Sequence, residues 1–174
     1  MAHPELFRLT PDDRLAREAA ERLFDEVKPV LDAILPPTAK VLHVGATSIP
    51  GCLTKGDLDI VVRVDPNDFA AAEATLAARF ARNLGSTRTR DFAAFEDSCR
   101  TPHLGIQLTA NGGVFDMFHR FTAALLADPA LVQRYNALKL AQAGQPMDSY
   151  RTAKDAFIAQ VLQLAPTWHD DLEG

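Results

Sequence analysis

Residues 44–60 read Val44-Gly45-Ala46-Thr47-Ser48-Ile49-Pro50-Gly51-Cys52-Leu53-Thr54-Lys55-Gly56-Asp57-Leu58-Asp59-Ile60. An apolar run ends in a glycine, small hydroxyl residues follow, and two acids separated by one residue begin a second apolar run. The branched residues of that run predict a strand over 57–64. Because alternate residues of a strand point to the same face, Asp57 and Asp59 should present their carboxylates side by side.

The residues around the acid pair suit the binding of a metal ion and a phosphate. Two neighbouring carboxylates repel each other unless a cation lies between them, and paired oxygen ligands suit Mg²⁺ or Mn²⁺. The glycine turn lets a phosphate approach the backbone, where hydroxyl and N–H groups add donors. Phosphoryl or nucleotidyl transfer requires this combination. We therefore expect Asp57 and Asp59 to be catalytic metal ligands, and Gly45-Ala46-Thr47-Ser48 to bind a nucleotide. Taken alone, the acids also fit a capping or solvent-facing role.

The composition predicts a single domain over 1–174, with a folded core over about 10–164 and a loose tail over 166–174. Apolar residues make up 47% of the chain and charged residues 24%, which speaks against wholesale disorder. A net charge of -5 gives no broad cationic surface, so polymeric DNA or RNA is not an expected partner. Two cysteines are too few for a disulfide framework. The sequence shows neither a secretory signal nor a membrane span, and a cytoplasmic location is expected.

Helix signals stand on both sides of the acid pair. Thr10 is the expected hydroxyl N-cap of a helix over 11–34, in which apolar residues recur at helical spacing. A second start signal predicts a helix over 65–82. Towards the C-terminus, aspartates and a glycine delimit helices over 128–144 and 148–164.

The middle of the chain has the pattern of β-strands. Extended segments are predicted over 87–95 and 103–109. Asn111-Gly112-Gly113 is a strong reversal signal because these residues tolerate positive φ, and 114–119 should pair back as the next strand. The predicted fold class is α+β, a mixed β-sheet with an N-terminal helix and C-terminal helices packed on it.

Several motifs together resemble a known family. A glycine turn followed by Asp-x-Asp on a strand resembles the signature of the DNA polymerase beta-like nucleotidyltransferases. Residues 43–51, which begin with His43, resemble the H-[IV]-G-S-T-[AS]-[VI]-P-G motif of the GrpB family. His103-Leu104 resembles the family's H-L-H-V strand, and Tyr135-x-x-x-Lys139 and Tyr150-x-x-x-Lys154 are similar to its two late Tyr/Lys helices. The resemblance implies a nucleotidyltransferase fold over about 10–164.

The chain departs from the family pattern at two places. Ala46 stands where the family usually has serine, which removes one hydroxyl directed at phosphate. Lys55-Gly56-Asp57-Leu58-Asp59-Ile60 stands where many members read K-P-I-I-D-I, so this chain carries the full acid pair of active transferases. The second departure favours catalysis more strongly than the first weakens it.

The resemblance also directs attention to a third acid, because active transferases usually take one from a neighbouring strand. Asp116 lies between apolar residues in the predicted strand over 114–119 and is the candidate, both as a catalytic residue and as a metal ligand. A carboxylate in an apolar strand is costly unless it is paired or metal-bound. The alternative is that Asp116 pairs with an arginine or faces water.

Two late lysines are candidates for contact with a triphosphate. Lys154 is at helical spacing from Tyr150 on a largely apolar face, and Lys139 has the same relation to Tyr135. Lys139, Tyr150 and Lys154 are therefore expected to bind the nucleotide. In the alternative, both lysines lie at the margin of the apolar stripe and only their stems are covered.

Three functions remain in competition at this stage. The first is a nucleotidyltransferase that uses a nucleoside triphosphate, Mg²⁺ and a hydroxyl acceptor on a small molecule or a protein. The second is a catalytically inactive nucleotide-binding or partner-assisting module, because GrpB-like domains occur joined to dephospho-coenzyme A kinase. The third is a metal-dependent hydrolase that uses His43, His103 and His119 together with the acids, although the spacing of the histidines gives only a weak metal signal.

Overall fold

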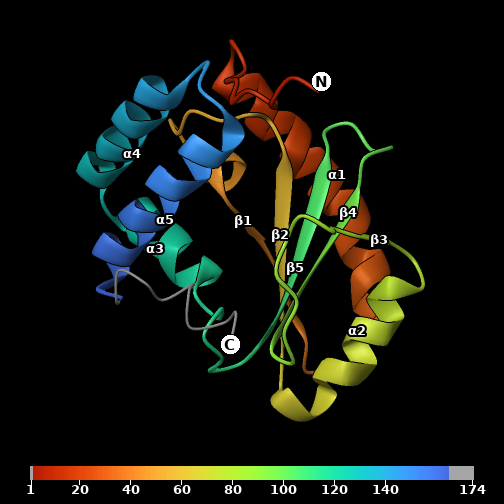
Figure 1. Cartoon of the computed structure of the whole chain (residues 1–174). Coiled ribbons are helices and arrows are strands. Elements are labelled where there is room, and N and C mark those ends of the chain that lie inside the picture. The colour runs from red at the N-terminus through yellow and green to blue at the C-terminus, as the bar shows by residue number, and fades with distance from the viewer. Residues whose placement is uncertain (1, 165–174) are drawn as a thin grey trace.

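A mixed sheet of five strands lies at the centre of the computed structural model, which describes residues 2–164 (Figure 1). The strand order is β1-β2-β5-β4-β3; β2 and β5 run parallel, and the other neighbouring pairs run antiparallel. The strands are β1 (Lys40–Val44), β2 (Leu58–Val64), β3 (Ala81–Arg82), β4 (Phe92–Asp97) and β5 (Leu104–Ala110). The predicted α+β class is confirmed.

Helices cover the sheet on both faces (Figure 1). On one face lie α1 (Asp13–Ile34) and α2 (Phe69–Ala77). On the other face lie α3 (Phe118–Ala127), α4 (Pro129–Gln142) and α5 (Met147–Leu162). Two short 3-10 helices, η1 (Ala46–Ser48) and η2 (Pro66–Asp68), follow β1 and β2. No helix within residues 2–164 has both the length and the apolar character needed to cross a bilayer.

Alternation along β2 decides which side chains reach each face of the sheet. Leu58, Ile60, Val62 and Val64 are fully buried in the core beneath α1 and α2. The residues between them therefore face α3, α4 and α5. Asp59 and Arg63 lie on this second face, so the acid pair sits between the sheet and the C-terminal helices.

Several predicted elements differ from the structure at their boundaries. The helix predicted over 65–82 is shorter, because η2 precedes α2 and the short strand β3 follows it. The strand predicted over 87–95 begins only at Phe92. The N-cap of α1 is Asp12, whose Oδ1 accepts from the N–H of Leu15, whereas the N–H of Thr10 donates to the carbonyl of Thr54. The tail predicted over 166–174 lies outside the described residues.

The strand predicted over 114–119 is wrong. The N–H of Asp116 donates to the carbonyl of Gly113 at 3.0 Å, which closes a turn, and α3 then begins at Phe118. The apolar alternation that suggested a strand has a packing cause. The rings of Phe115 and Phe118 lie 4.4 Å and 6.0 Å from the ring of Phe92 on β4, so the turn covers the sheet instead of extending it.

Candidate nucleotide and metal site

The turn after β1 has a backbone conformation that requires glycine. Gly45 has φ 78° and ψ -175°, a region that residues with a side chain almost never occupy. The buried hydroxyl of Thr47 donates to the carbonyl of Asp57 at 2.9 Å and lies 2.9 Å from Nε2 of His43. Because a hydroxyl has one hydrogen to give, His43 must donate to it through Nε2. Burial lowers the pKa of His43 to about 4 and so keeps the ring neutral. The turn is thereby fixed to the start of β2.

The donors that this turn offers to an anion are backbone groups. The hydroxyl of Ser48 donates to the carbonyl of Gly45 at 2.6 Å, and the Thr47 hydroxyl is engaged as described. Within the part of the chain that the structure describes, the N–H groups of Ala46 and Thr47 have no hydrogen-bond acceptor. The hydroxyls of Thr47 and Ser48, which were expected to contact a phosphate, instead shape the turn. The N–H groups of Ala46 and Thr47 remain available to contact a phosphate.

The carboxylate of Asp59 occupies a space left by two glycines. Asp59 pairs with Val44 of β1 and with Gly105 of β5. A Cβ atom on Gly45 would lie 2.7 Å from Oδ2 of Asp59, and a Cβ atom on Gly105 would lie 3.1 Å from Oδ1. Each carboxylate oxygen therefore faces one glycine.

This carboxylate has no hydrogen-bond donor among residues 2–164. Burial raises the pKa of Asp59, the nearby Asp57 adds to the rise, and the positive charge of Lys154 opposes it. An unpaired carboxylate in such a place is costly and gains from a cation. The buried carboxylate of Asp59, which has no donor within the described residues, is therefore suited to bind a divalent metal ion.

Asp57 lies directly before β2 on the same face. Its half-buried carboxylate is 3.6 Å from Nζ of Lys55, and both acids line one cavity. Within the described range, no three His, Cys, Asp or Glu side chains form a group that could hold a metal ion. Asp57 and Asp59 would therefore supply two ligands, and Mg²⁺ commonly completes its shell with water and substrate phosphates.

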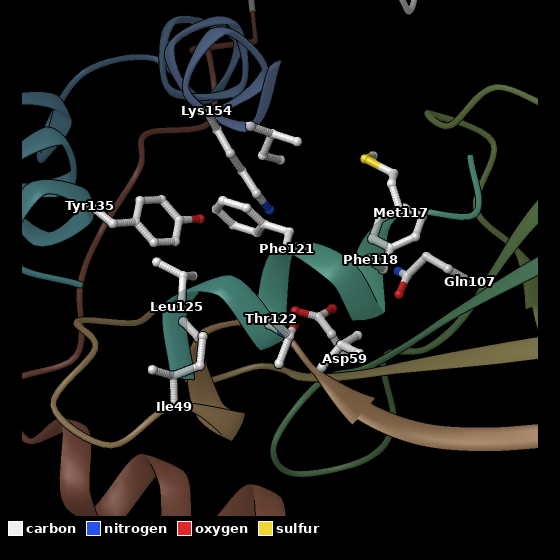
Figure 2. Close-up of a pocket in the computed structure, with 14 residues that line it drawn as sticks. Ile49, Asp59, Gln107, Met117, Phe118, Phe121, Thr122, Leu125, Tyr135 and Lys154 are labelled. Atoms are coloured by element: carbon white, nitrogen blue, oxygen red, sulfur yellow. The ribbon is translucent and has the colours of Figure 1, made fainter. Parts of the chain in front are cut away.

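Two connected cavities meet at Asp59. The larger, of about 210 Å³, is polar and is lined by Lys55, Asp57, Lys139, Tyr150 and Arg151, among others. The smaller, of about 90 Å³, is mainly apolar and lies under α3 and α5 (Figure 2). Gly45, Ala46, Asp59, Tyr135 and Lys154 line both cavities.

Lys154 extends from α5 into the space above Asp59 (Figure 2). Its ammonium has no hydrogen-bond acceptor and no ion-pair partner in the described part of the chain. Burial by itself would lower the pKa of Lys154, but the acidic groups of Tyr150, Asp59 and Asp155 together raise it. An enclosed and unpaired positive charge thus faces the cavity next to the glycine turn.

Lys139 and Tyr150 line the polar cavity but also have structural partners. The ammonium of Lys139 donates to the carbonyl of Leu53 and lies 4.0 Å from the ring centroid of Tyr135. Burial lowers the pKa of Lys139 to about 8. The hydroxyl of Tyr150 is 3.1 Å from that of Tyr135, and its ring stacks on Phe7 at 3.8 Å. These two residues build the cavity wall, whereas Lys154, which has no partner within the described residues, can meet a ligand.

Asp116 does not join the acid pair. Nε and Nη2 of Arg63 donate to its two oxygens at 2.6 and 2.8 Å, and the N–H of Gly112 donates at 2.9 Å. Burial opposes the charge, but the Arg63 guanidinium and the Gly112 N–H hold the pKa of Asp116 below its usual range. Arg63 is four residues from Asp59 along β2, roughly 13 Å. The structure thus agrees with the arginine alternative, and Asp116 is omitted from the candidate site.

We expect Asp116→Asn to weaken the fold and to leave ligand binding unchanged. The substitution leaves a largely buried guanidinium without its charge partner, which costs about 3 kcal/mol. Because the folded-state pKa of Asp116 is lowered, its contribution is present above the unfolded pKa and is lost as the pH falls. Urea unfolding between pH 7 and pH 3 measures this. A fall in Mg²⁺-nucleotide affinity at unchanged stability would return Asp116 to the site.

A pair of glycine variants separates backbone strain from contact with the acid. Gly45→Ala and Gly51→Ala both place a side chain at positive φ, which costs about 1–3 kcal/mol. A Cβ on Gly51 meets nothing within 4 Å, whereas one on Gly45 meets Asp59. We expect both variants to lose stability in chemical denaturation, and Gly45→Ala alone to lose metal binding by calorimetry. Equal metal affinity in the two variants would contradict the close approach of Gly45 to the Asp59 carboxylate.

The three histidines do not converge on one site. His43 contacts Thr47, Nε2 of His103 lies 3.7 Å from Glu96, and Nδ1 of His119 lies 3.6 Å from Asp116. Each ring thus has a different neighbour, which removes the geometric basis of a histidine-centred hydrolase.

Sequence reasoning missed two residues on β5. Gly105 and Gln107 lie on the same sheet face as Asp59, since Asp59 pairs with Gly105 and Val61 pairs with Gln107. The strand itself was predicted over 103–109. What the sequence lacked was the register between two strands that are more than forty residues apart.

Comparison with known proteins gives consistent matches. A family model described as GrpB protein matches residues 11–164. A UPF0157 protein of Vibrio cholerae is 36% identical over 148 residues, which cover 84% of this chain and 78% of that protein. The crystal structure of conserved protein GrpB from Enterococcus faecalis has a TM-score of 0.65 at 22% identity and covers 89% of this chain and 93% of that one. Cid1 poly(U) polymerase with Mg 3'-dATP bound has a TM-score of 0.52 at 16% identity; the match covers 88% of this chain and 49% of that one. The structural matches show a nucleotidyltransferase-like fold.

Proposed function

The chain belongs to the GrpB family, and we propose that it is a metal-dependent nucleotidyltransferase that acts on a hydroxyl group with a nucleoside triphosphate. One observation carries the proposal. Asp59 and Lys154, of opposite charge and without ion-pair partners among residues 2–164, line the same cavity as the glycine turn. Such an arrangement suits a ligand that brings both a cation and an anion, as a Mg²⁺-triphosphate does. A nucleotide substrate also agrees with the cytoplasmic location expected from the sequence.

The triphosphate would lie in the polar cavity beside residues 45–48. The N–H groups of Ala46 and Thr47 donate to phosphate oxygens, and Lys154 contributes a compact positive charge. Asp57 and Asp59 would hold Mg²⁺ or Mn²⁺, which supplies neutralisation of phosphate charge. Lys139 and Tyr150 keep the cavity wall in place, and Ser48 holds the shape of the turn.

The transfer step needs an acceptor hydroxyl on the other side of Asp59. The hydroxyl oxygen forms a bond to the α-phosphorus, and the bond from that phosphorus to the bridging oxygen of pyrophosphate breaks. Because Asp116 is bound to Arg63, Asp57 and Asp59 are the carboxylates placed to accept the hydroxyl proton. The acceptor would be a small molecule or a protein side chain; the acidic chain offers no broad cationic surface for polymeric nucleic acid.

Calorimetry combined with a pyrophosphate assay tests this proposal. We expect nucleoside triphosphates to bind in the presence of Mg²⁺, to bind more weakly with EDTA, and to release pyrophosphate once an acceptor is supplied. Binding that depends on Mg²⁺ but never yields pyrophosphate would support the alternative, a catalytically inactive nucleotide-binding or partner-assisting module. The presence of Asp57 beside Asp59 favours the enzyme. Absence of any metal-dependent nucleotide binding would contradict both.

A further inference from the structure

The apolar cavity begins where the acid pair ends. It is lined by Met117, Phe118, Phe121 and Leu125 around α3 and by Ile158 of α5, with Asp59 and Gln107 at one side (Figure 2). The proposed nucleotide site accounts for the polar cavity but gives no task to this one. A cavity that opens onto the reacting groups is the natural place for the second substrate.

The wall of this cavity contains an amide without a partner. Within residues 2–164, neither Nε2 nor Oε1 of Gln107 makes a hydrogen bond, and Oε1 is fully buried. Oε1 is closed off from the cavity, whereas Nε2 is not among the fully buried atoms, so a ligand in the cavity can accept a hydrogen bond from Nε2.

The space over Gly105 has a specific pair of neighbours. A Cβ atom placed on Gly105 would meet Oδ1 of Asp59 at 3.1 Å and Nε2 of Gln107 at 3.5 Å. The first is an acceptor and the second is a donor. Both groups thus border the space beside Gly105, and a hydroxyl placed between them can accept from Gln107 and donate its proton to Asp59. Oδ2 of Asp59 faces Gly45 and the turn, so one carboxylate borders both the nucleotide side and this side.

The volume of the cavity limits the size of the group that carries this hydroxyl. At about 90 Å³ it is smaller than the cavity of roughly 150 Å³ that holds benzene in another protein. A nucleobase is larger than benzene, so the 3' end of a polynucleotide does not fit. A short aliphatic chain does fit against the methionine, phenylalanine and leucine side chains.

From these observations we infer that the apolar cavity is the acceptor subsite and takes a small aliphatic alcohol, with its hydroxyl beside Gly105 between Asp59 and Gln107. The inference rests on the proposed function, because it assigns the hydroxyl acceptor of that reaction. Gln107 binds and orients the alcohol, and Asp59 receives its proton as the new oxygen–phosphorus bond forms.

Methyl NMR on the full chain without nucleotide tests the subsite, with 1-propanol, an alcohol smaller than benzene, as the probe. We expect the probe to shift the methyl signals of Met117 and Ile158, whereas Met147, which lines only the polar cavity, stays unchanged. The corresponding thiol has the same carbon skeleton but is a weak hydrogen-bonding group, and it should bind about five-fold more weakly. Uridine should leave the two signals unshifted.

Gln107→Leu is the matched variant, since it keeps most of the side-chain volume and removes the amide. The variant should bind the alcohol and the thiol equally, and its thermal stability should be maintained or raised. Equal binding of the two probes to the wild-type protein, or a uridine shift at Met117, would overturn the inference. Because no nucleotide is present, these results do not depend on the calorimetry: alcohol binding without nucleotide binding defeats the proposed function and with it the acceptor role, but leaves the alcohol site, whereas nucleotide binding without alcohol binding defeats only the subsite.

Discussion

Asp59→Asn should abolish transfer and leave the fold at least as stable as the wild-type protein. The substitution removes a charged oxygen from the metal site, where several kcal/mol of transition-state stabilisation correspond to about 10³-fold in rate or more. The fold makes no hydrogen bond to this carboxylate within the described residues, so asparagine breaks no contact. A pyrophosphate-release assay and urea unfolding measure the two effects.

The stability difference between Asp59→Asn and the wild-type protein should change with pH in a defined direction. Burial raises the pKa of Asp59 in the folded chain. Below the unfolded pKa of about 3.9, both states are protonated and Asp59 costs nothing. As the pH rises through the folded pKa, the native state must ionise at a cost. The stability advantage of Asp59→Asn over the wild-type protein should therefore grow with pH and then level off.

A matched control uses an acid of the same type on the surface. Asp32→Asn changes an exposed residue of α1 that pairs with Lys28, and it should alter neither transfer nor this pH profile. Residual transfer in Asp59→Asn comparable to the wild type, or a loss of stability at neutral pH, would contradict the account of Asp59.

Lys154→Met should weaken the binding of Mg²⁺-triphosphate by about ten- to hundred-fold. The unpaired ammonium faces the cavity, and a hydrogen bond to a charged group contributes about 1.5–3 kcal/mol. Methionine keeps the apolar stem, so the packing of α5 should be preserved. Isothermal titration with a non-hydrolysable triphosphate measures the change.

Lys139→Met is the contrasting variant on the neighbouring helix. Its ammonium donates to the Leu53 carbonyl, so the loss should appear as reduced stability of about 1–3 kcal/mol. If Lys154→Met unfolds as readily as Lys139→Met while both keep nucleotide affinity, the two lysines are equivalent structural residues. That result would remove the triphosphate role of Lys154.

Local rules predicted the parts of the fold that depend on periodicity. The strand that carries Asp59 and the helix ending at Ile34 follow from alternation and 3.6-residue spacing, and both are confirmed, although the strand begins at Leu58 and leaves Asp57 directly before it. The same alternation failed over 114–119. There the apolar residues cover a sheet from outside, and a turn closed by Gly113 and Asp116 satisfies the backbone locally.

The candidate site needed contacts that no local pattern contains. The partner of Asp116 is Arg63, and the space for Asp59 depends on Gly105, and both facts follow from pairing between distant strands. Likewise, the sequence placed Lys139 and Lys154 in equivalent motifs. The structure distinguishes them, because among residues 2–164 Lys139 finds a carbonyl group to bind and Lys154 does not.

The position of a bound Mn²⁺ ion tests the central claim most directly. Crystals soaked with Mn²⁺ and a non-hydrolysable triphosphate should show an anomalous peak between the carboxylates of Asp57 and Asp59, at coordination distance from an oxygen of each. The triphosphate should lie beside Ala46 and Thr47, within reach of Lys154. An anomalous peak elsewhere, or none at a saturating Mn²⁺ concentration, would contradict the claim that these two acids form a metal site.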